Sequence, residues 1–260
     1  MDLPALESAT SLAPSPDWAL LLDVDGTLLP IAETPDGVLG SAQLCGILSR
    51  LAPALGGALA LISGRSIENL DRLFAPLTLA AAGLHGLERR DAAGRLHLLG
   101  EAEALDHLRA PLAELAEEHP GLLLEDKGRA LALHYRKAPD QKARLEGRVA
   151  ALLAGSQDSL RLIHGKMVLE IKPRHADKGS AVRAFMAEAP FDGRTPVFLG
   201  DDITDEDGFR AVNALGGLSI HVGLVVATEA RYRLADVEQV WLWLGTLADG
   251  LGAPREGAAP

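Results

Sequence analysis

The chain has 260 residues, of which 48% are hydrophobic and 23% charged, a composition typical of soluble globular proteins that bury a sizeable core. Its net charge of −11 argues against nonspecific binding to nucleic acid, because phosphate backbones attract basic surfaces. The single cysteine, Cys45, excludes an intrachain disulfide, and no segment reads as a signal peptide or a membrane span. We therefore expect a cytoplasmic protein with no nucleic acid, no membrane and no obligate protein partner.

The first predicted element is a buried strand over residues 18–24, preceded by a flexible leader over residues 1–16. It runs into Asp23-Val24-Asp25-Gly26-Thr27. Side chains at i and i+2 of a strand share one face, so Asp23 and Asp25 lie together at the carboxyl end, where open α/β sheets bind ligands. The pair indicates a carboxylate nucleophile with an acid/base partner, a hard-metal site, or both. The alternative is a simple turn, with Asp25 capping the next segment.

A second strand end follows at Ser63-Gly64-Arg65, after the apolar run of residues 58–62. A hydroxyl and backbone amides that open a helix suit a phosphate group, although an ordinary Ser cap fits the pattern equally well. Lys178 begins a later helix, where the helix dipole disfavours a cation, and this placement hints at a function. A solvated surface lysine is the alternative.

A cluster of acids lies at the end of the predicted strand over residues 195–200. Five of the seven residues in 201–207 are acidic: Asp201, Asp202, Asp205, Glu206 and Asp207. Helix capping explains two or three of these carboxylates, and a divalent cation would relieve the repulsion among them.

Strands and helices alternate in two stretches of the chain, which predicts a parallel sheet with helices on both faces. The strands are expected at 18–24, 58–63, 78–83, 195–200 and 217–222, and the helices at 41–53, 65–74, 178–188, 205–214 and 236–248. The fold class is thus α/β, a Rossmann-like doubly wound parallel sheet core formed by residues 17–86 and 173–250. A flexible tail is expected over residues 251–260.

The stretch between these halves, residues 87–172, reads as an inserted α+β cap domain. It contains predicted hairpins at 87–99, 121–136 and 159–172 and helices at 101–118 and 140–154. Residues 127–178 hold twelve Lys and Arg against five Asp and Glu, an excess that fits an anionic substrate or, in part, a solvated helix face. Carboxylates and lysines around the hairpin turns suit sugar hydroxyls, with cross-strand ion pairing as the alternative.

Taken in order, Asp-x-Asp-Gly-Thr, Ser-Gly-Arg, Lys178 and Gly-Asp-Asp-x-x-Asp resemble the haloacid dehalogenase superfamily of aspartate-nucleophile phosphohydrolases. The pieces Gly83-Leu84-His85-Gly86, Glu-x-Lys, His-Tyr-Arg and Gly-Lys-x-x-x-Glu-x-Lys-Pro are similar to the trehalose-6-phosphate phosphatase family. This resemblance covers residues 18 to about 245.

The resemblance implies a Mg²⁺-dependent phosphomonoester hydrolase that takes a small sugar phosphate, trehalose 6-phosphate, and forms an aspartyl-phosphate. Related caps leave a sucrose-6-phosphate or mannosyl-3-phosphoglycerate type of phosphatase as the alternative. The implied catalytic residues are Asp23, Asp25, Ser63 and Lys178. The implied metal ligands are Asp23, Asp25 (through its carbonyl) and Asp201, supported by Asp202 and Asp205. The implied substrate-binding residues are Gly64, Arg65, His85, Glu125, Lys127, Lys166 and Glu170.

Overall fold

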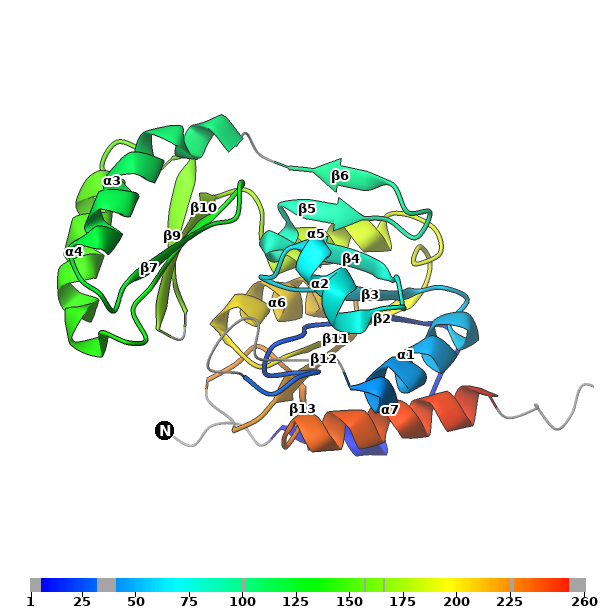
Figure 1. The fold of residues 1–260 in the computed structure, drawn as a ribbon. Helices are drawn as coiled ribbons and strands as arrows, with labels where there is room; N and C mark the ends of the chain where they lie inside the picture. Colours follow the sequence, from blue (N-terminus) through cyan, green and yellow to red (C-terminus); the bar gives the residue numbers. More distant parts are fainter. Residues whose placement is uncertain are drawn as a thin grey trace, which may run out of the picture. The chain divides into compact units, whose positions relative to one another are not determined.

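The computed structural model describes residues 6–31, 41–99, 102–156, 158–165, 167–224 and 227–252 (Figure 1). The chain splits into two compact units, a core unit of Met1–His97 with Asp177–Pro260 and a second unit of Leu98–Ala176. Each unit has a hydrophobic core of its own. Within the described ranges, no helix combines the length and the hydropathy needed to cross a bilayer.

The core unit is built on a nine-stranded sheet with the order β1-β13-β12-β11-β2-β3-β4-β5-β6. Its strands, in that order, are Glu7–Ser8, Tyr232–Leu234, Leu218–Val222, Thr195–Gly200, Trp18–Leu22, Leu59–Ile62, Ala80–Gly83, Glu88–Arg90 and Leu96–Leu98. Neighbours from β1 to β4 are parallel, and β5 pairs antiparallel with β4. The chain moves outward from β2 in both directions, so β2 is the switch point where such sheets bind ligands.

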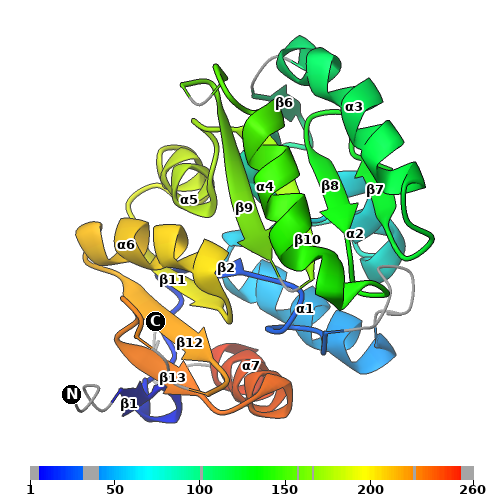
Figure 2. The same ribbon diagram turned by 90° about the vertical axis from the view of Figure 1, so that its left-hand side faces the viewer.

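Helices cover both faces of this sheet (Figures 1 and 2). Helices α1 (Ala42–Ala54), α2 (Ile67–Phe74) and α7 (Val237–Gly252) contribute to one apolar cluster, and α5 (Lys178–Met186) and α6 (Glu206–Ala214) to the other. Strand β2 contributes side chains to both clusters, because Leu20 and Leu22 point to the first and Leu21 to the second. Its five residues are all buried, as expected of a strand covered on both faces. The predicted doubly wound α/β core is confirmed.

The second unit is a four-stranded antiparallel sheet of order β7-β8-β10-β9, with two helices. Its strands are Leu123–Asp126, Leu131–His134, Val168–Pro173 and Leu160–Gly165, in sheet order, and its helices are α3 (Asp106–Glu117) and α4 (Lys142–Leu152). Leu169 and Ile171 of β10 join the apolar cluster that α3 and α4 complete. Because side chains alternate along a strand, Glu170 and Lys172 occupy the opposite face of the sheet. This sheet therefore has one apolar and one polar face.

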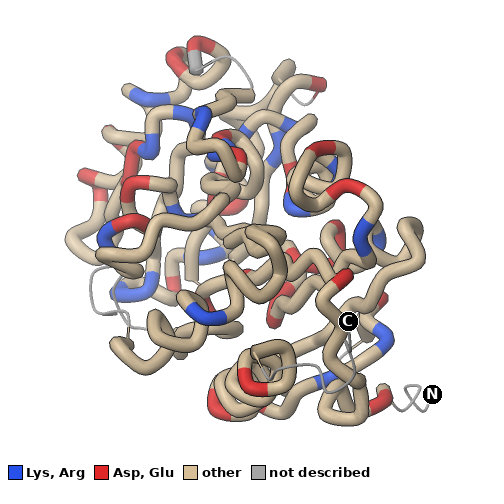
Figure 3. The backbone as a smooth tube through the Cα atoms, turned by 90° about the vertical axis from the view of Figure 1, so that its right-hand side faces the viewer, with Lys and Arg blue, Asp and Glu red and all other residues tan. Residues whose placement is uncertain are grey.

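Basic and acidic residues are interleaved along the chain (Figure 3). Several cations of the basic stretch 127–178 pair with carboxylates of the same unit. Arg144 and Arg148 both contact Glu118, and Lys142 lies 3.8 Å from Glu146. Part of the predicted charge excess is therefore neutralised locally on the helices.

Two predicted boundaries differ from the structure. The leader was expected to be flexible through residue 16, yet β1 pairs with β13 and the carbonyl of Ala9 accepts a hydrogen bond from the Trp243 indole, 3.0 Å away. The hairpin β5–β6 was assigned to the cap from residue 87, but β5 extends the core sheet through its pairing with β4. The partner of β1 is supplied by long-range pairing that a local pattern does not reveal, whereas β5 pairs with β4, the strand directly before it, across the short Leu84–Gly86 segment.

Candidate active site

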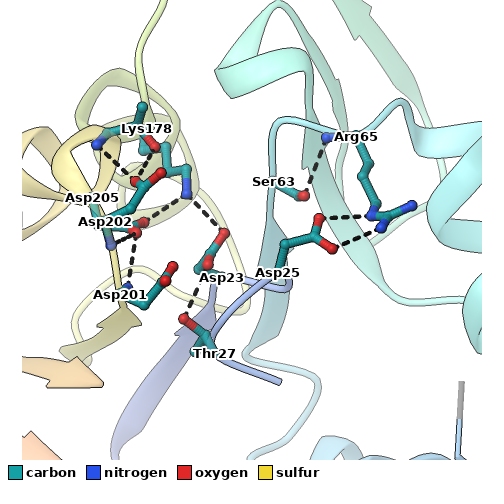
Figure 4. Close-up of polar contacts among 10 residues, drawn as sticks. Asp23, Asp25, Thr27, Ser63, Arg65, Lys178, Asp201, Asp202 and Asp205 are labelled. Carbon is teal, nitrogen blue, oxygen red and sulfur yellow. Dashed lines mark hydrogen bonds and ion pairs between the residues drawn. The ribbon is translucent and has the colours of Figure 1, made fainter. Parts of the chain in front are cut away.

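The residues predicted from four strand ends lie at one edge of the core sheet (Figure 4). Asp23 follows β2, Asp201 follows β11 and Ser63 follows β3, and these strands are adjacent and parallel. Strand β4, next to β3, ends at Gly83 and leads to His85. Parallel neighbours present their carboxyl ends at the same edge, which explains how segments far apart in the sequence form one site.

Asp23 is the buried carboxylate at the centre of this edge, with 3% of its surface exposed. Its Oδ2 accepts a hydrogen bond from the Thr27 hydroxyl at 3.0 Å, and its Oδ1 accepts one from Lys178 Nζ at 2.7 Å. Burial raises the pKa of Asp23 to about 7, with Lys178 opposing the rise and Asp201 adding to it. Asp23 is therefore a desolvated carboxylate whose charge depends on a nearby cation.

Lys178 lies between two carboxylates. Its Nζ is 2.7 Å from Asp23 and 2.6 Å from Asp205 Oδ1. Although burial lowers the pKa of Lys178, the two carboxylates raise it well above its ordinary value, so the ammonium keeps its charge. The Asp177 side chain forms a capping box with Ser180, which makes Lys178 the first residue of α5 and aims it at the sheet edge.

Asp205 fixes the loop that follows β11. Its Oδ2 accepts hydrogen bonds from the backbone N–H groups of Asp201 and Asp202, both at 3.0 Å. The Asp202 side chain in turn accepts from the backbone N–H of Thr204 at 2.8 Å. Burial opposes the ionisation of Asp202, but Lys178 and the hydrogen bonds from Thr204 outweigh it and lower the pKa of that carboxyl.

The last two acids of the cluster serve as anchors. Glu206 accepts hydrogen bonds from the Thr228 hydroxyl and the Glu229 N–H, at 2.7 and 2.8 Å, and Asp207 pairs with Arg210. Hydrogen bonds and ion pairs within the protein thus engage the carboxylates of Asp202, Asp205, Glu206 and Asp207. Asp201 is the acid whose carboxylate is directed at the DxDGT loop.

The oxygen donors beside Asp23 fit a hard divalent cation. Asp23, Asp201 and Asp205 each offer a carboxylate oxygen within 4.8 Å of the others. Gly26 has φ +88°, and a Cβ there would lie 2.1 Å from Asp201 Oδ2, so glycine lets the Asp201 carboxylate lie against the loop. Asp205 is fully buried and binds Lys178 and the backbone N–H groups of Asp201 and Asp202, so we assign Mg²⁺ to Asp23 and the half-buried Asp201.

Asp25 forms a bidentate ion pair with Arg65. Arg65 Nε and a terminal guanidinium nitrogen each lie 2.7 Å from one carboxylate oxygen, and the remaining nitrogen donates to Asn69 Oδ1 at 2.8 Å. The Ser63 hydroxyl accepts a hydrogen bond from the Arg65 N–H at 3.2 Å. Arg65 was expected to contact substrate, and the structure instead places its guanidinium on Asp25.

His85 lies beside the Ser63 loop. Its side chain is 8% exposed, and a Cβ on Gly64 would come within 2.6 Å of His85 Nε2, so only glycine fits there without displacing the ring. The backbone N–H of His85 donates to the carbonyl of Ser63 at 2.9 Å. The predicted roles of Gly64 and His85 in substrate binding stay predictions.

The predicted cap residues form pairs within the second unit. Glu125 Oε2 and His134 Nε2 lie 2.9 Å apart in a hydrogen bond that lowers the pKa of Glu125. Lys127 Nζ donates to Glu170 at 3.4 Å, and Glu170 is 6% exposed. The pairs fit the cross-strand alternative as well as sugar recognition. Lys166 lies outside the described residues.

Glu88 and Asn69 make two contacts of this region that were not predicted from the sequence. Glu88 accepts a hydrogen bond from the Ile67 N–H at 2.6 Å, and Asn69 accepts one from Arg65. The i, i+4 spacing of Arg65 and Asn69 was visible in the sequence, where a helix is expected from residue 65, but α2 begins at Ile67 with Ser66 as its N-cap, so Arg65 precedes the helix. The contact made by Glu88 depends on how β5 pairs with β4.

Comparison with known proteins gives a consistent assignment. The trehalose-phosphatase family profile matches residues 21–238. The chain is 49% identical to a probable trehalose-phosphate phosphatase of Sinorhizobium fredii, covering 82% of this chain and 81% of the relative. It is 46% identical to the trehalose-6-phosphate phosphatase of Escherichia coli, covering 93% and 91%. Among solved structures, the C-terminal domain of C. albicans trehalose-6-phosphate phosphatase matches with a TM-score of 0.79 and 25% identity, covering 89% and 92%.

Proposed function

The chain belongs to the trehalose-phosphatase family, and on that premise we propose that it hydrolyses trehalose 6-phosphate to trehalose and phosphate, with Asp23 as nucleophile. The observation that carries the mechanism is the buried Asp23 carboxylate, held by Lys178 and Thr27 at the switch point of the sheet. A desolvated carboxylate oriented on both oxygens is suited to in-line attack on phosphorus.

In the first step, Asp23 attacks phosphorus while the bond from phosphorus to the sugar oxygen breaks, which gives an aspartyl-phosphate. Asp25 donates its proton to the departing sugar oxygen, so that the leaving group is a neutral alcohol. Ser63 and Lys178 contact the phosphoryl oxygens, and Lys178 also offsets the charge of Asp23.

In the second step, Asp25 removes a proton from water, and the resulting nucleophile attacks phosphorus of the aspartyl-phosphate. The bond between phosphorus and Asp23 breaks, phosphate leaves and the free Asp23 carboxylate is regenerated. The same group thus acts first as acid and then as base, which returns the enzyme to its starting protonation state.

A magnesium ion would be held by Asp23, Asp201 and the backbone carbonyl of Asp25. When bound, it neutralises negative charge on the transferring phosphoryl group and lowers the repulsion met by an anionic nucleophile. In this assignment Asp202 and Asp205 orient the loop that carries Asp201.

Sugar recognition is assigned to the polar face of the second unit, acting as the cap. Glu125, Lys127, Lys166 and Glu170 are proposed to contact the glucose hydroxyls, since carboxylates accept and ammonium groups donate hydrogen bonds. Because phosphatases of the sucrose-6-phosphate and mannosyl-3-phosphoglycerate type have related caps, they remain the alternative. We also propose that the protein is cytoplasmic and that its partner is the small-molecule sugar phosphate.

Phosphate release from trehalose 6-phosphate, measured beside sucrose 6-phosphate, mannosyl-3-phosphoglycerate and glucose 6-phosphate, tests this function. We expect kcat/KM for trehalose 6-phosphate to exceed the others by tenfold or more, on the order expected when buried polar groups lose their partners. A higher kcat/KM for another sugar phosphate would reassign the substrate but keep the chemistry. No phosphate release from any of them would refute the enzymatic assignment.

A further inference from the structure

We propose that Glu88 is a positioning residue that fixes the Ser63–Arg65 loop and thereby holds Arg65 in register with Asp25. This inference rests on the proposed function, in which Asp25 is the acid/base residue and Arg65 orients it. It starts from the register of strand β5 in the core sheet.

Strand β5 presents alternate side chains to opposite faces of the sheet. Arg89 lies on the face of α5, with its guanidinium carbon 5.2 Å from the Phe185 ring centroid. Glu88 and Arg90 point to the face of α2. Glu88 accepts the Ile67 N–H at 2.6 Å, and Arg90 forms a bidentate pair with Asp71 at 2.7 Å for both contacts. Strand β5 thus holds α2 at two points one helical turn apart.

The Glu88 contact falls where α2 joins the Ser63–Arg65 loop. Ile67 is the first residue of α2, so its N–H has no partner within the helix, and a carboxylate there is favoured by the helix dipole. Gly83 makes room for this junction: a Cβ on Gly83 would lie 2.6 Å from Glu88 Oε1 and 2.8 Å from both Arg65 O and Ile67 N. A carboxylate, a carbonyl and an amide therefore converge on a position that only glycine can occupy.

The backbone between Arg65 and Ile67 is held on both sides. The N–H of Leu84 donates to the carbonyl of Arg65 at 2.9 Å, and Glu88 accepts from Ile67 two residues later. From this fixed segment the Arg65 side chain extends to the Asp25 carboxylate. A shift of the segment would move the guanidinium, whose two contacts require a planar, bidentate fit. Small displacements of a positioned group are costly to catalysis.

The variants E88D and E88Q separate position from charge. E88D keeps the charge but withdraws the acceptor by about 1.5 Å, the length of one carbon–carbon bond. E88Q keeps the reach and an acceptor oxygen but loses the charge. We expect E88D to lower kcat about tenfold with little change in KM, as for one charged hydrogen bond, and E88Q to stay within about threefold of wild type.

The matched control is D71A, which removes the other anchor between the same strand and the same helix. If Glu88 acted only by docking β5 on α2, D71A would lower kcat as much as E88D. We expect D71A to lower the melting temperature while kcat stays within about twofold of wild type. Circular dichroism on all three variants confirms the folded state in which kcat is compared.

A double-mutant cycle on kcat tests the route through Arg65. In this proposal Glu88 acts on Asp25 by way of Arg65, so adding E88D to R65A should lower kcat further by less than about twofold. Additive losses, an equal effect of D71A, or a greater loss in E88Q than in E88D would each overturn the proposal. Absence of phosphate release by the wild-type protein would instead refute the proposed function, so the two failures are distinguishable.

Discussion

Arg65 and Asp25 meet in a bidentate ion pair in which each carboxylate oxygen of Asp25 has its own guanidinium nitrogen at 2.7 Å. The two residues are 40 positions apart in the chain. The arginine side chain is 11% exposed and the aspartate side chain 37%, so the pair is partly shielded from water. With both oxygens engaged by Arg65, the Asp25 carboxylate has a defined orientation, which suits it to take a proton from water in the second step.

R65K tests this relationship. Lysine keeps the positive charge but cannot form the two parallel contacts that the guanidinium forms. We expect kcat for trehalose 6-phosphate to fall about tenfold in R65K and further in R65A, since Asp25 loses its orientation. Steady-state phosphate release measures both variants. A kcat above that of wild type in R65A would show that the pair holds Asp25 away from the reaction.

D23N and D25N separate the nucleophile from the acid/base. An amide is nearly isosteric with a carboxylate but does not attack phosphorus, so D23N should abolish phosphate release and leave no phosphorylated protein. D25N should lower kcat by about 10²–10⁴-fold, the usual contribution of a general acid/base, and still form the aspartyl-phosphate. Acid quenching followed by mass spectrometry distinguishes the two. Wild-type turnover in D23N would contradict the covalent mechanism.

The core of the fold follows from the sequence because strands buried on both faces of a parallel sheet are continuous apolar runs. Leu20 to Leu22 and Phe198 to Gly200 are such runs, and acidic residues follow each of them directly. The two strand ends meet because the strands are parallel neighbours in the sheet. Helix starts were also readable, since Asp177 caps α5 and leaves Lys178 as its first residue.

Other features depend on strand pairing and side-chain contacts that the sequence does not show. The segment Glu7–Ser8 becomes a strand only because β13, more than 200 residues later, lies parallel to it. The contact of Glu88 with α2 requires the register in which Gly83 lies opposite Glu88. The partner of Arg65 was missed because Ser-Gly-Arg by itself suggests a phosphate rather than a carboxylate as the ligand of the guanidinium.

Chelation should abolish activity, and added Mg²⁺ should restore it. The oxygen donors Asp23 and Asp201 suit this ion, and the loop around Gly26 has no soft ligand. D201A should raise the Mg²⁺ concentration needed for half-maximal activity or remove activity altogether, whereas D207A, which removes the pair with Arg210, should keep the wild-type requirement. Full turnover in excess chelator would rule out the metal.

The stability of the metal-free protein should fall as pH rises. The pKa of Asp23 is about 7 when folded, against an ordinary value of 3.8, so between these values the folded state holds a proton that the unfolded state has lost. The unfolded state binds fewer protons, and the free energy of unfolding decreases with pH across this window. Below about pH 4 the trend reverses, because carboxyls of lowered pKa such as Asp91 and Asp202 lose their contribution.

Melting temperatures between about pH 5 and pH 8 in chelator measure this dependence. The slope should be smaller in D23N, which has no proton to lose. Added Mg²⁺ should stabilise the wild-type protein more at the upper end of the range, because the ion binds the ionised carboxylate. Equal slopes in the wild-type protein and D23N would show that Asp23 is not the group responsible.

Recognition and chemistry should separate between the two units. The cap variants E125A, K127A, K166A and E170A are each expected to lower kcat/KM for trehalose 6-phosphate by an amount equivalent to about 1–3 kcal/mol, as for a lost hydrogen bond to a charged group. Because remote binding energy also contributes to the reacting step, kcat can fall while KM rises. Hydrolysis of p-nitrophenyl phosphate should change much less, since this ester lacks the sugar hydroxyls.

E118A is the matched control for the cap variants, since it removes the carboxylate that Arg144 and Arg148 share on the helical face of the same unit. It should leave kcat/KM for both substrates near wild type. K178A, in the core unit, should abolish both activities, because Lys178 contacts the nucleophile and the phosphoryl group is common to both substrates. Equal losses on the two substrates in all four cap variants would assign Glu125, Lys127, Lys166 and Glu170 to the stability of the sheet. The ion pair between Lys127 and Glu170 would then be a cross-strand contact without a role in recognition.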